Sequence, residues 1–404
     1  MNKLLTISAI LVGFSTLAQK FEIPTKNHPF TDVIEWKGMG SILMSNDPNT
    51  RQINLTLVGN QETSIWDQKF TPKNDDYYYL SSENARYVYF IDDLGLKDGK
   101  AYFSQLNSAG NVKATSVSIG SALKKLGNYD YNKLELINAV VTDKALVYHF
   151  RYDDSKEKSV REFAVFITHH NFLPYAVELG SIKNADLKND DIGQFSYIGF
   201  TDDQIYFAAR TYQSGKGWNV QSFTSKGKPQ PSLFIKAPKD LLAVEDIGFG
   251  TTGKYYLKDK SDIERGLIAQ INGSFYMVGG QKRSTGSALV LMKYVDEEWE
   301  EINVMVLNYF IEKKSLKLGI YPMNEGIGYH LDHNGYNKVS IISFTPEEES
   351  AHNDFTDRAI YNPSCVLHRK KKEEFTVDLP EGVLVFDASK LGTATVIEFE
   401  LREK

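Results

Sequence analysis

Cysteine is almost absent from this chain, because Cys365 is the single one in 404 residues. An intrachain disulfide is therefore excluded. A chain of this length buries enough surface to fold without such cross-links. The apolar residues around Cys365 favour a buried structural thiol over a reactive one.

Long apolar runs are missing beyond the first residues, and no later segment reaches the ~20 apolar residues that span a bilayer. The start combines a basic residue, the apolar stretch Leu4 to Phe14 and a small-residue exit at Ala18. This pattern is typical of a secretory signal peptide cleaved before Gln19. The residue directly after that point is Gln19 and not a cysteine, so a bacterial lipoprotein anchor is not expected. We expect residues 1–18 to be the signal peptide and residues 19–404 to be one exported domain, periplasmic or secreted.

Basic residues are outnumbered, with 46 Lys and Arg against 52 Asp and Glu and a formal net charge of −6. Nucleic-acid binding requires a basic stripe that this composition does not favour. Binding to an anionic membrane surface is disfavoured for the same reason. We therefore expect a protein or a glycan as partner.

Common catalytic signatures are also missing, since neither G-x-S-x-G nor H-E-x-x-H occurs. The stretch Gly248 to Lys254 fits G-x-G-x-x-G, but a strand-like Tyr-Tyr-Leu follows where a phosphate loop requires a helix. Ser121 to Lys124 fits S-x-x-K without its companion motifs. We expect no catalytic residue and no cofactor.

The histidines do not form a clear set of metal ligands. His169 and His170 are adjacent at a strand end, so their side chains should point to opposite faces. His330, Asp332 and His333 supply two or three ligands near a turn, whereas zinc needs three or four. An ordinary hairpin is the favoured interpretation, and we expect no metal.

What the chain does contain is a turn rich in Asp, Asn, Gly or Lys that is repeatedly followed by an alternating aromatic strand. The aromatic strands are centred near Leu43, Tyr102, Tyr148, Tyr206, Tyr276, Tyr329 and Val385. Such a repeat predicts stacked copies of one supersecondary unit. The spacing fits blades of about 40 to 50 residues. We predict an all-β fold, a β-propeller of six or seven four-stranded blades, with seven preferred.

A propeller must also close its ring, because unpaired edge strands aggregate. The head Lys20 to Ile23 and the tail Thr393 to Leu401 both read as strands, and we expect them to pair in one blade. An extra hairpin is expected at Gly253 to Lys260. The alternative fold is two consecutive β-sandwich domains with a boundary near Lys236 to Pro238, but the repeat continues through that boundary.

One segment of the sequence resembles a known family. Thr201 to Phe223 is similar to the repeat of TolB-type propellers, in which an Asp-Gly turn precedes an Ile-Tyr-Phe strand, and Lys97 to Val112 matches more weakly. The likeness covers about two blades. The family's turn proline is missing from 201–204, and its later aspartate is replaced by Asn219. The resemblance implies a periplasmic or secreted propeller that serves as a scaffold for protein contacts.

Two charged clusters interrupt the repeat. One is Asp296 to Glu301, which surrounds Trp299, and the other runs from Glu347 to Asp357 and is followed by the basic stretch Arg369 to Lys372. Such runs are usually solvated loops, but charges also steer partners. Trp299 is either an interface anchor or packed on the outer face of a blade. The candidate interaction surface comprises Trp299, Glu298, Glu300, Glu348, Arg369 and Lys370.

From these features we expect an exported, non-catalytic propeller that acts as a protein-interaction or scaffold subunit, in a bacterial cell-envelope complex. The alternative is a glycan-acting hydrolase or lyase, or a sugar-binding module, that uses the propeller channel. An enzyme of this kind needs two carboxylates flanking one bond, and the sequence does not single out a pair.

Overall fold

The structure of the 404-residue chain is a computed structural model. The structure describes residues 19–24, 29–36, 39–47, 49–50, 52–59, 64–72, 78–81, 86–91, 96, 98–154, 159–183, 192–211, 217–238, 244–246, 263–264, 267–271, 273–307, 316–323, 326–333, 336–343, 352–354, 374–379, 382–387 and 396–402. The predicted signal peptide, residues 1–18, and the predicted hairpin at Gly253 to Lys260 lie outside the described residues. Within the described part, no helix is long and apolar enough to cross a membrane.

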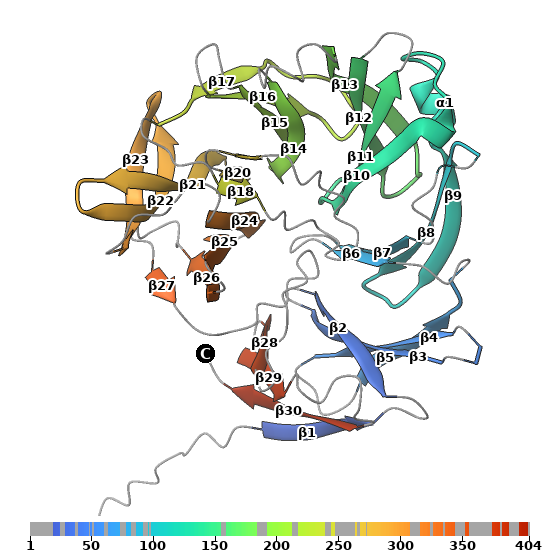
Figure 1. The fold of residues 1–404 in the computed structure, drawn as a ribbon. Helices are drawn as coiled ribbons and strands as arrows, with labels where there is room; N and C mark the ends of the chain where they lie inside the picture. The colour runs from blue at the N-terminus through green and yellow to red at the C-terminus, as the bar shows by residue number, and fades with distance from the viewer. Residues whose placement is uncertain are drawn as a thin grey trace, which may run out of the picture.

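The described strands form seven sheets arranged in a ring (Figure 1), so the expected seven-bladed propeller is confirmed. Blade 1 contains β2 (Phe30–Trp36), β3 (Gly40–Asn46), β4 (Ile53–Val58) and β5 (Ser64–Phe70). Blade 2 contains β6 (Tyr78–Ser81), β7 (Tyr87–Ile91), β8 (Lys100–Asn107) and β9 (Val112–Ser118). A short helix α1 (Ile119–Leu123) and a 3-10 turn η1 (Tyr131–Lys133) lead into the next blade.

Blades 3 and 4 are four-stranded sheets. Blade 3 contains β10 (Leu134–Val141), β11 (Ala145–Asp154), β12 (Ser159–Thr168) and β13 (Pro174–Lys183). Blade 4 contains β14 (Ile192–Phe200), β15 (Ile205–Thr211), β16 (Gly217–Phe223) and β17 (Leu233–Lys236). In both blades the strands pair in chain order and are antiparallel, with the first strand nearer the middle of the ring (Figure 1).

Blade 5 repeats the pattern, whereas blade 6 is enlarged. Blade 5 contains β20 (Leu267–Ile271), β21 (Ser274–Arg283), β22 (Gly286–Val295) and β23 (Glu298–Leu307). Blade 6 contains β24 (Leu316–Met323), β25 (Gly326–His333), β26 (Tyr336–Ser343) and β27 (His352–Asp354). Two short strands that precede blade 5 in the chain, β18 (Val244–Asp246) and β19 (Ile263–Glu264), join the free edge of β24. The β18–β24 pair is parallel and lies toward the middle of the ring (Figure 1).

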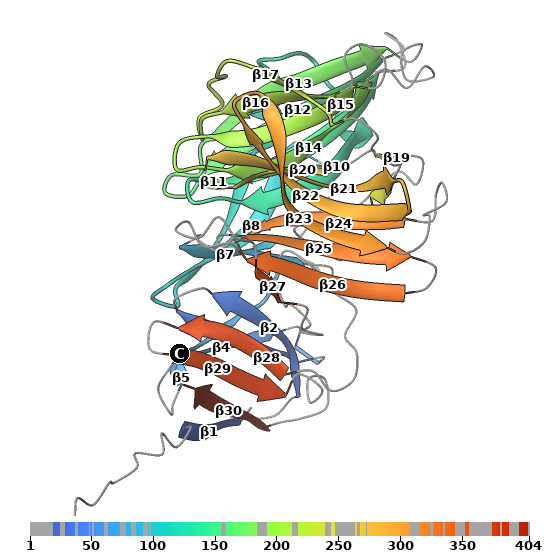
Figure 2. The same cartoon turned by 90° about the vertical axis from the view of Figure 1, so that its left-hand side faces the viewer.

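Blade 7 closes the ring. Its first three strands are β28 (Glu374–Leu379), β29 (Gly382–Asp387) and β30 (Val396–Arg402), and its outermost strand is β1 (Gln19–Pro24). Figure 2 shows β1 and β30 side by side at the edge of the molecule. Phe21 lies opposite Phe399, which is fully buried. The predicted pairing of head and tail is therefore confirmed.

Neighbouring blades share their cores, because both faces of a middle strand are covered. In β11, Leu146 and Tyr148 belong to an apolar cluster shared with blade 2, whereas Ala145 and Val147 belong to one shared with blade 4. The strand is consequently buried at every position from 145 to 150. Period-2 alternation here separates two packed faces rather than a packed face from a wet one.

The repeated turn of the sequence joins the first and second strands of a blade. In blades 3 and 4 it starts with a threonine whose hydroxyl accepts a hydrogen bond from the backbone three residues later: Ala145 N to Thr142 Oγ1 is 3.1 Å, and Gln204 N to Thr201 Oγ1 is 3.3 Å. Six of the seven predicted strand centres lie on second strands. Tyr102 instead lies on β8, the third strand of blade 2, because the turn before it joins β7 to β8. The predicted sequence distances from Tyr102 to the strand centres before and after it are therefore wrong as blade lengths.

The two-sandwich alternative does not fit this arrangement. Ile235 of β17 packs into one apolar cluster with Met277 of β21 and Val290 of β22. That cluster joins blade 4 to blade 5 across the predicted boundary at Lys236 to Pro238. The chain therefore continues from blade to blade at this point.

Candidate functional site: a cleft between blades 3 and 4

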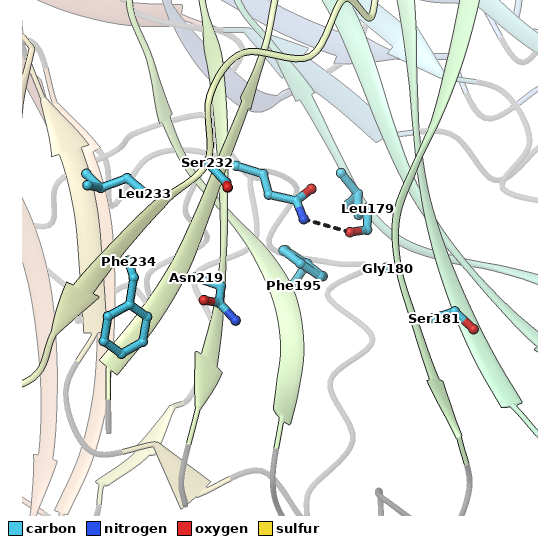
Figure 3. Close-up of a pocket in the computed structure, with 9 residues that line it drawn as sticks. Leu179, Gly180, Ser181, Phe195, Asn219, Ser232, Leu233 and Phe234 are labelled. Atoms are coloured by element: carbon cyan, nitrogen blue, oxygen red, sulfur yellow. Dashed lines mark hydrogen bonds between the residues drawn. The ribbon is translucent and has the colours of Figure 1, made fainter. Parts of the chain in front are cut away.

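A cleft of about 390 Å³ opens between the outer parts of blades 3 and 4. It is lined by residues 179–181 of β13, by Phe195 of β14, by Asn219 and Gln221 of β16, and by residues 232–234. Figure 3 shows Phe195 between Asn219 and the β13 side, with Phe234 on the β17 side. None of the nine lining residues is ionisable, so the cleft is neutral.

The cleft exists because β13 is irregular where it faces blade 4. The register between β12 and β13 shifts after Glu162, which lies opposite Gly180, so Leu179 is an extra residue. Such a bulge changes the direction of backbone groups. The carbonyl of Leu179 accepts a hydrogen bond of 3.0 Å from Gln221 Nε2 (Figure 3), which links the two blades across the cleft.

Gly180 provides the space for the cleft floor. A Cβ added at this position would lie 2.8 Å from Cε2 of Phe195, closer than real Cβ atoms approach. Glycine therefore allows the Phe195 ring to lie against β13. Phe195 is 7% exposed, so most of its ring forms the packed floor.

The rim on the β17 side is apolar and exposed. Leu233 and Phe234 keep 42% and 43% of their surface accessible, although Ile235 after them is fully buried. Isolated exposed apolar residues are ordinary, but two adjacent ones beside a cleft form a candidate contact surface.

A buried His–Glu pair lies behind the floor. His149 Nε2 and Glu162 Oε2 are 3.1 Å apart, and their side chains are 3% and 2% exposed. Glu162 Oε2 also accepts a hydrogen bond of 3.0 Å from the backbone N–H of Phe195. Among the described residues, His149 Nδ1 and Glu162 Oε1 have no hydrogen-bond partner. Through its bond to the Phe195 backbone, the pair holds blade 4 against blade 3.

A second polar cluster lies at the turns that join the first and second strands of blades 3 and 4. Burial raises the pKa of Asp143 to about 6, and the nearby Asp202 carboxyl adds to this shift, while Lys144 and Arg86 oppose it. In the described part of the chain Asp143 Oδ1 is buried without a hydrogen-bond partner. The described residues contain no group of three His, Cys, Asp or Glu side chains able to hold a metal ion.

The adjacent histidines have different environments. His169 is 4% exposed, whereas His170 is exposed. His169 Nε2 lies 2.7 Å from the carbonyl oxygen of Thr142, and its Nδ1 lies 2.6 Å from the hydroxyl of Tyr89. Burial lowers the pKa of His169 to about 4. His169 is therefore a neutral side chain that connects blades 2 and 3.

The predicted interaction residues fall into two groups. Trp299 is partly buried on β23, and its Nε1 donates a hydrogen bond of 2.6 Å to the carbonyl oxygen of Lys236. Its ring contacts Trp218, which is 2% exposed. Glu298 and Glu300 on the same strand are exposed. The remaining predicted residues, Glu348, Arg369 and Lys370, lie outside the described residues.

Trp299 therefore packs blade 5 against the end of β17, which carries the rim of the cleft. Sequence reasoning identified Trp299 and missed the cleft. The available signal was Gly180 inside a strand pattern, which often marks a bulge or a close approach. The side chains of His330, Asp332 and His333 on β25 are not among those that the structure describes.

No family model matches the chain, and no curated protein matches it. Solved structures with a similar fold include an ulvan lyase from a new polysaccharide lyase family, at 10% identity and a TM-score of 0.42, covering 95% of this chain and 96% of that one. Streptogramin B lyase is similar at 10% identity and a TM-score of 0.38, covering 96% of this chain and 98% of that one.

The propeller domain of the Trilobed protease from Pyrococcus furiosus is also similar, at 10% identity and a TM-score of 0.33, covering 81% of this chain and 99% of that one. At this level of identity such likenesses concern the fold alone. The strand order within the described residues makes the chain a seven-bladed β-propeller whose last blade contains both ends of the fold.

Proposed function

We propose that this chain is an exported, non-catalytic β-propeller that binds a protein partner as a subunit of a bacterial cell-envelope complex. Export is supported by the signal-peptide pattern of the first 18 residues. The strand β1 begins at Gln19, directly after the expected cleavage point.

The observation that carries the proposal is the neutral cleft with its exposed apolar rim at Leu233 and Phe234. Protein interfaces are depleted of charge at their centre and enriched in aromatic side chains. An acidic hairpin lies next to this surface on the blade 5 side, where Trp299 contacts the end of β17. Exposed Glu298 and Glu300 give the region a polar edge that steers approach without entering the cleft.

The channel of the propeller is the place that a glycan-acting enzyme would use. The short strand β18 pairs with the inner edge of β24 and lies toward the middle of the ring (Figure 1). The glycan-acting alternative requires space there for a sugar chain and two carboxylates. The cleft between blades 3 and 4 opens instead at the outer part of the ring.

The proposal is tested by expressing the full chain with a C-terminal tag in a Gram-negative bacterium. N-terminal sequencing of the purified protein checks cleavage before Gln19. Crosslinking of intact cells followed by affinity purification should recover a reproducible envelope protein. Replacing Leu233 and Phe234 by serine should remove that protein, whereas Ile65→Ser, at a site 46% exposed on blade 1, should not. Absence of a reproducible partner in repeated experiments contradicts the proposal.

A further inference from the structure

The shape and composition of the cleft identify what it accepts. We propose that it receives one large apolar side chain from an extended, uncharged segment of the partner. This inference rests on the proposed function, because it names how the partner is recognised.

The cleft has the form of an anchor pocket. Its volume of about 390 Å³ lies at the lower end of the range in which pockets enclose small ligands. Phe195 and Leu179 supply an apolar floor, and Phe234 supplies an exposed aromatic ring at the side. An apolar side chain placed there exchanges water contacts for contacts with these groups, as the central residue of an interface does.

The absence of charge in the lining decides the class of occupant. A carboxylate or an ammonium group entering the cleft would lose hydration and meet no opposite charge among the lining residues. Acidic, basic and phosphorylated side chains are therefore rejected. The His149–Glu162 pair behind the floor does not alter this, because both side chains are almost fully buried and bonded to each other.

The polar groups of the lining suit a peptide backbone. The polar residues of the lining are Asn219, Gln221, Ser181 and Ser232, and Gln221 Nε2 already donates to the Leu179 carbonyl. A carboxamide carries the same donor and acceptor groups as a peptide bond, so it can pair with the main chain of a bound segment. The cleft lies between β13 and β17, the outermost strands of their blades. An extended segment bound there most readily runs along these strands.

Blocked tripeptides are suitable probes, with the form acetyl-Thr-X-Thr-amide and X set to Phe, Leu, Asp or Lys. Binding to the full purified chain is measured by ligand-observed NMR. We expect the Phe and Leu peptides to bind at least tenfold more tightly than the Asp and Lys peptides. Phe234→Ser should weaken the binding of the Phe peptide at least tenfold. Ile65→Ser, with a comparable exposed area on blade 1, should leave it unchanged.

A second variant fills the cleft without removing a packed group. Ser232 is exposed, so Ser232→Trp should fold normally and abolish peptide binding by occupying the cleft. Equal binding of charged and apolar peptides overturns the inference, as does binding that survives Ser232→Trp. Binding of maltose that is lost in Phe234→Ser, with no peptide bound, also overturns it, because the cleft is then a saccharide site.

The two proposals can fail separately. If the Ser232→Trp protein still recovers its envelope partner by crosslinking, the partner uses another surface, and only the inference about the cleft is wrong. If apolar peptides bind as expected while no partner is recovered from cells, the cleft inference stands and the proposed function is wrong.

Discussion

The hydroxyl of Tyr89 lies 2.6 Å from Nδ1 of His169, and the two buried residues connect blade 2 to blade 3. His169 Nε2 faces the carbonyl of Thr142 and must donate to it, so Nδ1 accepts the Tyr89 proton. The Tyr89 oxygen in turn accepts a hydrogen bond of 2.6 Å from Gln105 Nε2. Every donor in this chain of contacts has an acceptor, and the arrangement fixes how the two blades meet.

Tyr89→Phe should destabilise the protein by about 1–3 kcal/mol, because the variant leaves His169 Nδ1 without a partner and leaves the Gln105 amide only its 3.1 Å bond to the His169 carbonyl. Urea denaturation followed by tryptophan fluorescence measures the change. The control is Tyr206→Phe, on the second strand of blade 4, where the ring is only half-buried. An equal loss in both variants would show that the hydrogen bonds of Tyr89 have no special role.

His169 should make stability depend on pH. Its pKa is about 4 in the folded protein and 6.5 in the unfolded chain, so the unfolded chain takes up a proton first as pH falls. The contribution of the neutral ring is complete above pH 6.5 and is lost as pH falls to about 4. In His169→Asn, the slope of unfolding free energy against pH should be smaller in this window. An unchanged slope contradicts a buried neutral histidine.

Asp143 should have the opposite effect in nearly the same window. Its pKa is raised from 3.8 to about 6, so the folded state holds the proton more tightly, and stability falls as pH rises through this interval. Asp143→Asn should therefore raise the melting temperature at pH 7.5, and the gain should vanish as pH approaches 3.8. The matched control is Asp203→Asn, at an exposed position in the equivalent turn of blade 4. A gain that is independent of pH would exclude the carboxylate as its source.

Phe399→Ala should test the closure of the ring. Phe399 is fully buried in β30 and lies opposite Phe21 of β1. Loss of a buried phenylalanine costs about 3–5 kcal/mol, and here it also loosens the pairing of the two ends. Limited proteolysis should release the N-terminal strand before other fragments. Val396→Ala, at a position 40% exposed on the same strand, should have little effect.

Glu297→Gly should stabilise the hairpin between β22 and β23. Asp296 and Glu297 have φ angles of 48° and 67°, a left-handed conformation that costs L-residues ~1–2 kcal/mol and glycine little. We expect a gain of about 1 kcal/mol in unfolding free energy. Glu298→Gly, one residue later on β23, should instead destabilise, because glycine weakens a strand. A loss in both variants would indicate that the Glu297 side chain makes a needed contact.

The sequence was sufficient for the architecture and insufficient for the cleft. Alternation of apolar residues in strands such as Ile53–Val58, the recurring turns and the strand patterns at both ends predicted seven blades and their closure. These features are local, so they are visible in one dimension. The placement of Tyr102 was wrong because turns at both ends of a strand use the same residues, and composition does not distinguish the first turn of a blade from the second.

The cleft depends on relations that no local pattern contains. It requires the extra residue at Leu179, the contact between Gly180 and Phe195, and the bond from Gln221 to the neighbouring blade. Each of these joins residues from different strands or different blades. The sequence singled out Trp299 because of its acidic neighbours. Its hydrogen bond to the Lys236 carbonyl shows that the partly buried side chain also packs against the end of β17.

The pairing of β1 with β30 also sets the order in which the protein can be completed. Blade 7 contains the earliest and the latest strands that the structure describes, so a growing chain has no partner for β1 until synthesis reaches β30. Until then β1 remains a strand with unsatisfied edges, which is a risk for aggregation. Joining ends so far apart in sequence is slow, because contacts between distant segments form late. We therefore expect ring closure to be the final folding step, and a chaperone that shields β1 would act in that interval.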